Sequence, residues 1–404
     1  MRHIDYYIGV PLCFLVTWVS KIISLLFPAT VGKPRNILFM ELSEMGSAIL
    51  ADPAMRKAKT ALGASLYFCI FSGNRESLLL LNTVDEDHIF SIRGDGFLTL
   101  TVDSLRFLLW ARRNNIDTVI DLELFARFTA LLTGLSGATF RVGFFAYHNE
   151  GLYRGNMLTH KVAYNPHIHI SKNFISLVNA LISDNGEVPY SKTIIADSEL
   201  VLAKASTSAE EKSEMWKRVK QEYKSLKKHL DHLVLMNPNA SDLLPQRRWP
   251  REHFSALIRM ILEYDDTAVV LLTGSRSEYE GSQEIVAMTG MRRCVNFCGK
   301  VAFRELPALY SISTLMVTND SGPAHFASVT DLLTFVLFGP ETPLLYGSLG
   351  NSSPIYAGLA CSPCVSAANH RKTPCRDNVC MRVITPSSVF NKIKPSLKKN
   401  VVTA

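Results

Sequence analysis

The chain has 404 residues, which is more than one ordinary hydrophobic core supports, so two domains are expected. Apolar residues make up 47% and charged residues 20%, a balance that excludes a disordered chain. The net charge of +7 is small for this length, and no stretch combines dense Lys and Arg with interleaved aromatics, so we expect no nucleic-acid partner. A phosphorylated small ligand or an anionic membrane surface fits this charge better.

The amino-terminal residues 6–29 form an apolar run, YYIGVPLCFLVTWVSKIISLLFPA, that is nearly long enough to span a bilayer. Asp5 before the run and the lack of a small-x-small site after it argue against a cleaved signal peptide. The run predicts either a spanning helix, with the main body in the cytoplasm, or an interfacial helix with Trp18 and Lys21 near headgroups. A buried core helix is the alternative without a membrane. We expect residues 1–34 to be a membrane-associated segment.

The body of the chain alternates apolar, strand-like runs with helix-length segments. In a first domain, residues 35–205, strands are expected at 37–40, 65–71, 118–122 and 140–143. The charged stretch 206–232 predicts a solvated linker helix with Ser208 as its N-cap and Glu211 three residues on. In a second domain, residues 233–390, strands are expected at 232–236, 268–273, 295–297, 314–318 and 334–338, before a basic tail at 391–404. This alternation predicts an α/β fold with parallel sheets covered on both faces.

Two loops that follow predicted strands carry the most chemical content. LSEMGSAILADP follows the first strand, and ligands of open α/β sheets bind at such carboxyl ends. In the second domain, TLMVTNDSGPAHFAS places Asp320, Ser321 and Gly322 where a helix begins and His325 one turn into it. Unpaired backbone N–H groups there can hold a diphosphate. The alternative is that Asp320 or Ser321 only caps the helix.

Several segments together resemble glycosyltransferase family 9, the lipopolysaccharide heptosyltransferase family. They are NDSGPAH with its preceding CGKVAFRELPALYSISTLMVT, NPNASDLLPQRRWPREHF, LLTGSRSEYE and VIDLELFARFTALLTGLSGATFRVGF, and the similarity runs over residues 35–389. The resemblance implies a GT-B architecture, in which two Rossmann-like domains face a cleft. The second domain would bind a nucleotide-diphospho-sugar and the first an acceptor. Members of the family invert the anomeric centre and need no metal for transfer.

The resemblance also implies site residues. The expected donor-binding residues are Asn239, Ala240, Ser241, Arg247, Glu278, Asp320, Ser321, Gly322 and His325. In the first-domain loop, the family has an Asp as general base where this chain has Ser47, and a lone Ser hydroxyl is a poor base. Three acids could replace it as catalytic residues: Glu44, which we favour, Asp52 and Glu41. On the acceptor side we expect Ser47, Arg141 and Arg154, the two arginines belonging to a cluster of cations and imidazoles that could equally be scattered surface polarity.

Four cysteines, Cys361, Cys364, Cys375 and Cys380, crowd near the carboxyl terminus. Their spacing permits a structural zinc, and reduced packing cysteines or disulfides are the alternatives. The whole pattern predicts an inverting, metal-independent glycosyltransferase. Its acceptor would be lipid-linked or lipopolysaccharide-type, at the cytoplasmic face of a bacterial inner membrane. The rivals are a catalytically silent family member that scaffolds glycan assembly, for which Ser47 is the support, and a sugar-nucleotide epimerase of the same architecture.

Overall fold

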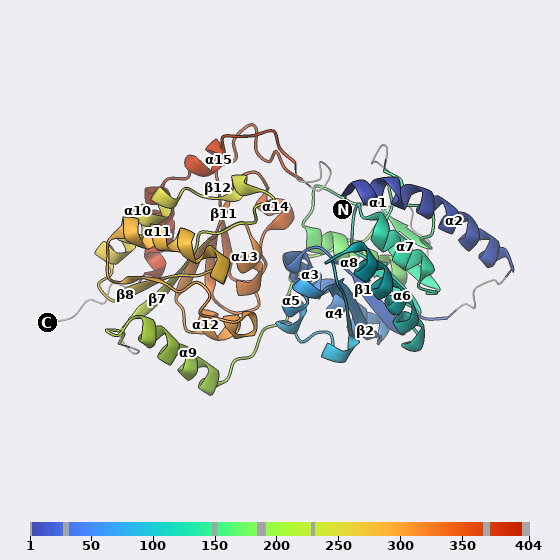
Figure 1. The fold of residues 1–404 in the computed structure, drawn as a ribbon, viewed down its shortest axis with the longest axis horizontal. Helices are drawn as coiled ribbons and strands as arrows, with labels where there is room; N and C mark the ends of the chain where they lie inside the picture. The colour runs from blue at the N-terminus through green and yellow to red at the C-terminus, as the bar shows by residue number, and fades with distance from the viewer. Residues whose placement is uncertain are drawn as a thin grey trace. The chain divides into compact units, whose positions relative to one another are not determined.

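The computed structural model describes residues 2–26, 32–147, 152–183, 191–227, 231–366 and 372–397. The chain divides into two compact units, Met1–Ala203 and Lys204–Ala404 (Figure 1). Each unit contains a six-stranded parallel sheet with helices packed against it. The predicted α/β class, with two parallel sheets, is therefore confirmed.

The sheet of unit 1 has the strand order β3-β2-β1-β4-β5-β6. Its strands are β1 (Asn36–Met40), β2 (Ser65–Phe71), β3 (Ile89–Ile92), β4 (Thr118–Asp121), β5 (Phe140–Phe144) and β6 (His160–Val162). The order in which the strands are added to the sheet reverses between β1 and β4. These two strands are parallel neighbours, and Met40 lies beside Asp121. In doubly wound sheets the carboxyl ends at this reversal diverge and leave room for a ligand, so this edge is the first place to look for a site.

Three helices cover one face of this sheet: α2 (Gly9–Leu26), α6 (Phe97–Arg113) and α7 (Arg127–Leu135). Helices α6 and α7 share one hydrophobic core with β1, β2 and β4, and α2 packs beside α7 (Figure 1). The opposite face carries α4 (Asp52–Leu62) packed against α8 (Ile170–Ile182), as right-handed crossovers require. The remaining short helices are α1 (Arg2–Tyr7), α3 (Met45–Leu50) and α5 (Glu76–Leu79).

The amino-terminal run forms α2, and only one stripe of this helix is buried. Gly9, Cys13 and Thr17, spaced four residues apart, face α7, where a side chain on Gly9 would collide with Arg127. The large apolar residues of the other side are exposed, so α2 is not a core helix buried all round. Across the described residues, no helix combines the length and the apolarity that crossing a membrane needs.

The sheet of unit 2 repeats the topology of unit 1, in the order β12-β11-β10-β7-β8-β9, with the reversal between β7 and β10. Its strands are β7 (His232–Asn237), β8 (Ala268–Leu272), β9 (Cys294–Asn296), β10 (Leu315–Asn319), β11 (Leu333–Phe338) and β12 (Ser352–Tyr356). The helices are α9 (Ala209–Glu222), α10 (Arg251–Tyr264), α11 (Tyr279–Thr289), α12 (Leu306–Ser311), α13 (Gly322–Ala327), α14 (Pro343–Tyr346), α15 (Val379–Arg382) and α16 (Pro386–Ile393). The largest buried side chain is Trp249, whose indole N–H donates to the Ile384 carbonyl.

Sequence patterns missed three strands, β3, β6 and β12, all at sheet edges. Edge strands are short and bury less, so they lack a long apolar run; β12 even contains Pro354, which an edge tolerates. The charged helix predicted over 206–232 is α9, which ends at Glu222. Its predicted start is confirmed: Ser208 accepts a hydrogen bond from the Glu211 amide, and the Glu211 carboxylate accepts one from the Ser208 amide.

Candidate active site

The reversal point of unit 1 gathers three glutamates. Glu41 follows β1 and Glu123 follows the neighbouring β4, while Glu44 lies three residues beyond Glu41. Glu123 accepts hydrogen bonds from the Ser43 hydroxyl at 2.7 Å and from the Leu42 amide at 3.2 Å. The carboxylate of Glu123, which follows the neighbouring strand β4, thus holds the turn after β1 in place.

Glu41 and Glu123 lie next to each other in different surroundings. Glu41 is 5% exposed, and burial raises the pKa of its carboxyl well above the ordinary value, helped by the charges of Glu123 and Glu44. Glu123 accepts hydrogen bonds from the Leu42 and Ser43 backbone amides. Carboxyl groups with a strongly raised pKa are common in sites that move protons.

Glu44 is the N-cap residue of α3, but its side chain makes no capping hydrogen bond. Its carboxylate instead accepts a hydrogen bond from the Ser47 hydroxyl at 3.1 Å. Glu44 is only partly buried, so a ligand can reach it, unlike Glu41. The residue at the family's Asp position thus orients the glutamate that we favour as the base.

Asp52, the second acid predicted as a base, lies fully buried at the start of α4. Its carboxylate accepts hydrogen bonds from the Ala203 amide and the Thr83 hydroxyl. Burial raises its pKa, and those hydrogen bonds oppose the rise. A carboxylate tied to two other segments in the core acts as a structural clamp, and this argues against a catalytic role.

The two arginines predicted on the acceptor side, Arg141 and Arg154, form hydrogen bonds with groups inside unit 1. Arg154 is buried and donates to the Ala126 and Phe144 carbonyls and to Asp121, whose pKa burial raises to about 6 although Arg154 lowers it. Arg141 donates to the Met157 carbonyl at 2.6 Å and to Ala138, and burial lowers its pKa. Both guanidinium groups thus fix strand ends and the segment that follows β5. Near them in the sequence, His148, one of the imidazoles of the expected acceptor-side cluster, lies outside the described residues.

In unit 2, amide side chains tie together the ends of β7, β8 and β10. Asn319 donates to the Pro238 carbonyl at 2.9 Å and accepts from the Trp249 amide at 3.1 Å. Asn237 and Asn239 both donate to the Thr273 carbonyl. These bonds hold the predicted donor loop, which includes Ala240 and Ser241, beside the end of β10; Ser241 accepts from the Leu243 amide within that loop.

Gly274, just after β8, allows two predicted donor residues to approach each other. A Cβ atom at this position would lie 2.6 Å from the Asn239 amide nitrogen and 2.9 Å from a Glu278 carboxylate oxygen. Glu278 itself accepts hydrogen bonds from the Ser275 amide and hydroxyl, at 2.6 and 2.8 Å. The structure thus brings Glu278 beside Asn239.

Arg247 lies between two buried acids at the reversal point of unit 2. One guanidinium nitrogen is 2.8 Å from Glu341, another donates to the Asp320 carbonyl at 3.3 Å, and Nε is 3.9 Å from the Asp320 carboxylate. Both acids are under 5% exposed, whereas the Arg247 side chain is 15% exposed. Sequence reasoning missed Glu341. The sequence signal that could have found Glu341 is its place in the loop GPETP, directly after the strand β11 that lies next to β10.

The NDSGPAH segment begins α13. Ser321 is the N-cap, but its hydroxyl donates to the Asn319 carbonyl and makes no capping hydrogen bond, so capping does not account for this serine. A side chain on Gly322 would meet the Phe326 ring at 2.9 Å, which explains the glycine by packing. His325 is buried, with its Nδ1 3.2 Å from the Ser348 hydroxyl.

The four carboxyl-terminal cysteines are free thiols, without disulfides. Burial raises the pKa of Cys380, and the charges of the other three sulfurs raise it further, so the four lie in one neighbourhood. Within the described ranges, however, no three or more His, Cys, Asp or Glu side chains are arranged to hold a metal ion.

Comparison with known proteins bears on this geometry. Residues 107–373 match glycosyltransferase family 9 (heptosyltransferase), a match that covers more than half of the chain. The chain belongs to this family. In the order of the chain, the matched residues run from α6 to the loop that follows Cys364, and so include all the predicted donor residues.

Individual members of the family give partial matches. The chain is 27% identical over 164 residues to a lipooligosaccharide heptosyltransferase 2 of Campylobacter jejuni, which is 39% of this chain and 49% of that protein. It therefore spans about half the length of this relative. Its fold is similar to Escherichia coli ADP-heptose lps heptosyltransferase II, with a TM-score of 0.68, 19% identity and coverage of 90% of this chain and 98% of that one. A family 9 glycosyl transferase from Veillonella parvula is similar at TM-score 0.67 and 17% identity, over 90% and 97% of the two chains.

Proposed function

We propose that this family 9 member is an inverting, metal-independent glycosyltransferase. It moves a sugar from a nucleotide-diphosphate donor to a hydroxyl of a lipid-linked or lipopolysaccharide-type acceptor. The observation that carries the proposal is the chemical difference between the two reversal points. Unit 1 offers carboxylates that can take a proton, and unit 2 offers polar loops with an arginine that can meet a diphosphate.

Donor binding is assigned to unit 2. The loops after β7, β8 and β10 expose small residues whose backbone N–H groups can approach an anion, and the Asn319 and Asn237 side chains hold these loops in place. Arg247 supplies the positive charge, since a guanidinium matches a phosphate geometrically. Glu341 competes with the phosphate for this guanidinium and so lowers the affinity of the site for the donor.

Proton transfer is assigned to unit 1. The acceptor oxygen forms a bond to the anomeric carbon on the face opposite the diphosphate, which leaves with the bonding electron pair, and the configuration inverts. Glu44 takes the acceptor's proton as general base, oriented by Ser47. Glu41 is buried, and burial raises the pKa of its carboxyl well above the ordinary value, which favours its protonated form.

The relatives suggest which donor to test first. One solved neighbour is described as an ADP-heptose lps heptosyltransferase, so ADP-heptose is our first choice of donor, with a lipopolysaccharide-core acceptor. Calorimetric titration of the full chain with ADP, UDP and their sugar conjugates is the direct test. We expect an ADP-linked ligand to bind and Arg247→Ala to weaken it. If no nucleotide binds the wild-type chain, the proposal fails.

Ser47 favours a second candidate, a silent family member that scaffolds glycan assembly. Incubation with donor, with and without acceptor, separates the candidates. Transfer gives product only with acceptor, an epimerase of this architecture would alter the donor alone, and a scaffold would give neither product. The hydrogen bond from Ser47 to Glu44 supports transfer. It places a carboxylate that can act as base beside Ser47, the position where the family has an Asp.

Two further parts of the proposal concern location and metal. We propose that the chain acts at the cytoplasmic face of the bacterial inner membrane, where it would meet a lipid-linked acceptor.

The spacing of Cys361, Cys364, Cys375 and Cys380 still predicts a structural zinc, and no step of transfer depends on it. Metal analysis of the purified chain is its test: zinc or iron well below one equivalent would rule it out.

A further inference from the structure

The helix layer α2–α7–α6 of unit 1 has an outer face that is apolar. On α6, the exposed residues Leu98, Val102, Leu105 and Leu109 recur every three or four positions and form one stripe. On α2, the stripe Leu15, Trp18, Ile22 and Leu25 does the same. Both helices pack against α7 (Figure 1), and their exposed stripes lie on the outside of this helix layer.

Contacts of α1 and α2 hold α2 along the surface of the unit. Asp5 accepts hydrogen bonds from the Arg127 and Phe128 amides, both at 3.0 Å, and pairs with the Arg127 guanidinium. Thr17 accepts from the Asn156 amide at 2.8 Å. Leaving this position would expose the buried Arg127 and break all of these bonds, so α2 presents its apolar stripe as part of unit 1.

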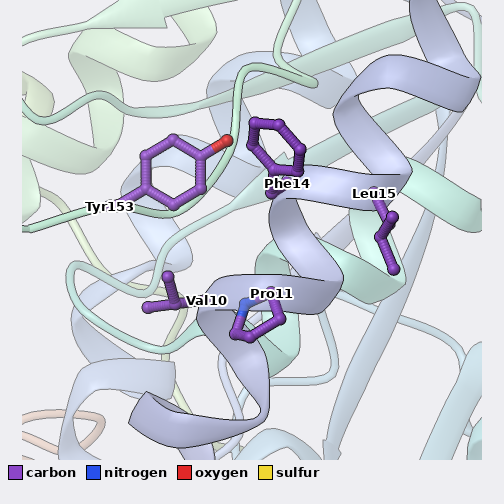
Figure 2. Close-up of a pocket in the computed structure, with 5 residues that line it drawn as sticks. All are labelled: Val10, Pro11, Phe14, Leu15 and Tyr153. Atoms are coloured by element: carbon purple, nitrogen blue, oxygen red, sulfur yellow. The ribbon is translucent and has the colours of Figure 1, made fainter.

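A hollow opens on the exposed side of α2. Its volume is about 540 Å³, and Val10, Pro11, Phe14, Leu15 and Tyr153 line it (Figure 2). The Tyr153 and Phe14 rings lie across it from each other, above Val10 and Pro11. Apart from the Tyr153 hydroxyl these side chains are apolar, so the hollow suits a hydrocarbon chain rather than a polar ligand.

The charges on this face match an anionic surface. Lys21 lies over the Trp18 ring, and Arg106 and Arg113 are exposed on α6. The residues of α2 include no acid, and Asp5 of the preceding helix α1 pairs with Arg127. On α6, the buried Asp103 accepts two hydrogen bonds at 2.8 Å from the Arg93 guanidinium and pairs with Arg106 at 3.4 Å. Apolar stripes with basic residues and neutralised acids are typical of surfaces that bind anionic lipid.

We propose that the outer face of α2 and α6 is a membrane-docking surface, on which both helices lie in the plane of an anionic bilayer and the hollow beside α2 receives an acyl chain. The proposal rests on the proposed function for its lipid-linked acceptor, and adds a second docking helix, α6, and an in-plane orientation. Docking through this face places unit 1, the proposed acceptor unit, directly on the lipid.

Flotation of the full chain with vesicles tests the surface. The probes are phosphatidylcholine vesicles and vesicles with about a third phosphatidylglycerol, without donor or acceptor. We expect Leu98→Ser/Leu105→Ser to reduce binding to the anionic vesicles about tenfold or more, because two exposed leucines no longer enter the bilayer. The matched control is Ile194→Ser/Val201→Ser, which removes two exposed apolar side chains outside α2 and α6 and should bind as wild type. Equal binding by all three proteins, or equal loss in both variants, would overturn the proposal.

Two additional readouts test charge and orientation. Arg106→Gln/Arg113→Gln should weaken binding to the anionic vesicles only, and alkaline carbonate should release the bound wild-type chain. Retention after carbonate would contradict an in-plane helix, and a change of oligomeric state in Leu98→Ser/Leu105→Ser without loss of lipid binding would assign the face to a protein partner. Nucleotide titration of the same variants separates the proposals: normal nucleotide binding with no vesicle binding by any form refutes docking alone.

Discussion

The two units share one topology, and their reversal points carry opposite chemistry. In unit 1, Glu41, Glu44 and Glu123 meet where β1 and β4 diverge, and Arg154 pairs with Asp121 and donates to backbone carbonyls. In unit 2, Arg247 lies where β7 and β10 diverge, between the buried acids Asp320 and Glu341. The same backbone frame therefore presents different side chains in the two units, and the loops rather than the sheet supply the difference.

The largest effect is expected from substitutions at the carboxylates of unit 1. Glu44→Gln removes the proposed base and should reduce transfer about 10²–10⁴-fold while leaving nucleotide affinity unchanged. Ser47→Ala should cost less, about tenfold, because it removes only the hydrogen bond that orients Glu44. Steady-state kinetics with a nucleotide titration measure both. Wild-type turnover in Glu44→Gln would refute the assignment, and attention would pass to Glu123.

The next effect concerns the anion side. Arg247→Lys keeps the charge but loses the planar fork, so nucleotide affinity should fall about tenfold or more. Glu341→Gln should have the opposite sign, a few-fold gain, because the carboxylate that holds the guanidinium at 2.8 Å loses its charge. Calorimetric titration of both variants decides between them. A loss of affinity in Glu341→Gln would mean that this glutamate positions Arg247 rather than competing for it.

A smaller effect separates structure from catalysis within unit 1. Asp52→Asn should lower the free energy of unfolding by about 1–3 kcal/mol, because an amide cannot accept both the Thr83 and Ala203 hydrogen bonds with its two groups. Turnover per folded molecule should remain near wild type, in contrast to Glu44→Gln. Denaturant unfolding gives the first quantity and active-site titration the second. A stable but inactive Asp52→Asn would restore this residue as a base.

The smallest effect is a pH dependence of stability that Glu41 creates. Its pKa is raised on folding, so above its ordinary pKa of 4.5 the folded chain binds a proton that the unfolded chain has released. The free energy of unfolding therefore falls as the pH rises from 4.5 toward the raised pKa, by up to about 1.4 kcal/mol per pH unit.

Glu41→Gln removes this slope, and denaturant unfolding across that range should show a variant more stable than wild type at neutral pH. Glu252→Gln, at an exposed glutamate of unit 2, is the matched control and should leave the slope unchanged. If Glu41→Gln also leaves it unchanged, Glu41 is ionised in the fold.

Local patterns determined the repeated strands and helices of this protein. Apolar runs such as residues 37–40 and 268–272 become central strands buried on both faces, and the Ser208–Glu211 pair starts α9 as expected. The polar loops after β7 and β10 were visible for the same reason, since each follows a strong strand signal directly. Glu44 and Ser47, three residues apart, could also be linked from sequence, because i and i+3 positions at a helix start are neighbours.

What the linear sequence left open depends on partners that are distant along the chain. Glu123 joins Glu41 because β4 pairs with β1, and Glu341 joins Arg247 through the β10–β11 pairing. Asp52 and Arg154 look like free site residues in sequence, yet burial beside Ala203 and Asp121 makes them structural. The apolar amino terminus predicted a helix, and α2 forms there. Only packing on α7 decided that Gly9, Cys13 and Thr17 turn inward while the large apolar residues stay outside, because small side chains alone allow that close contact.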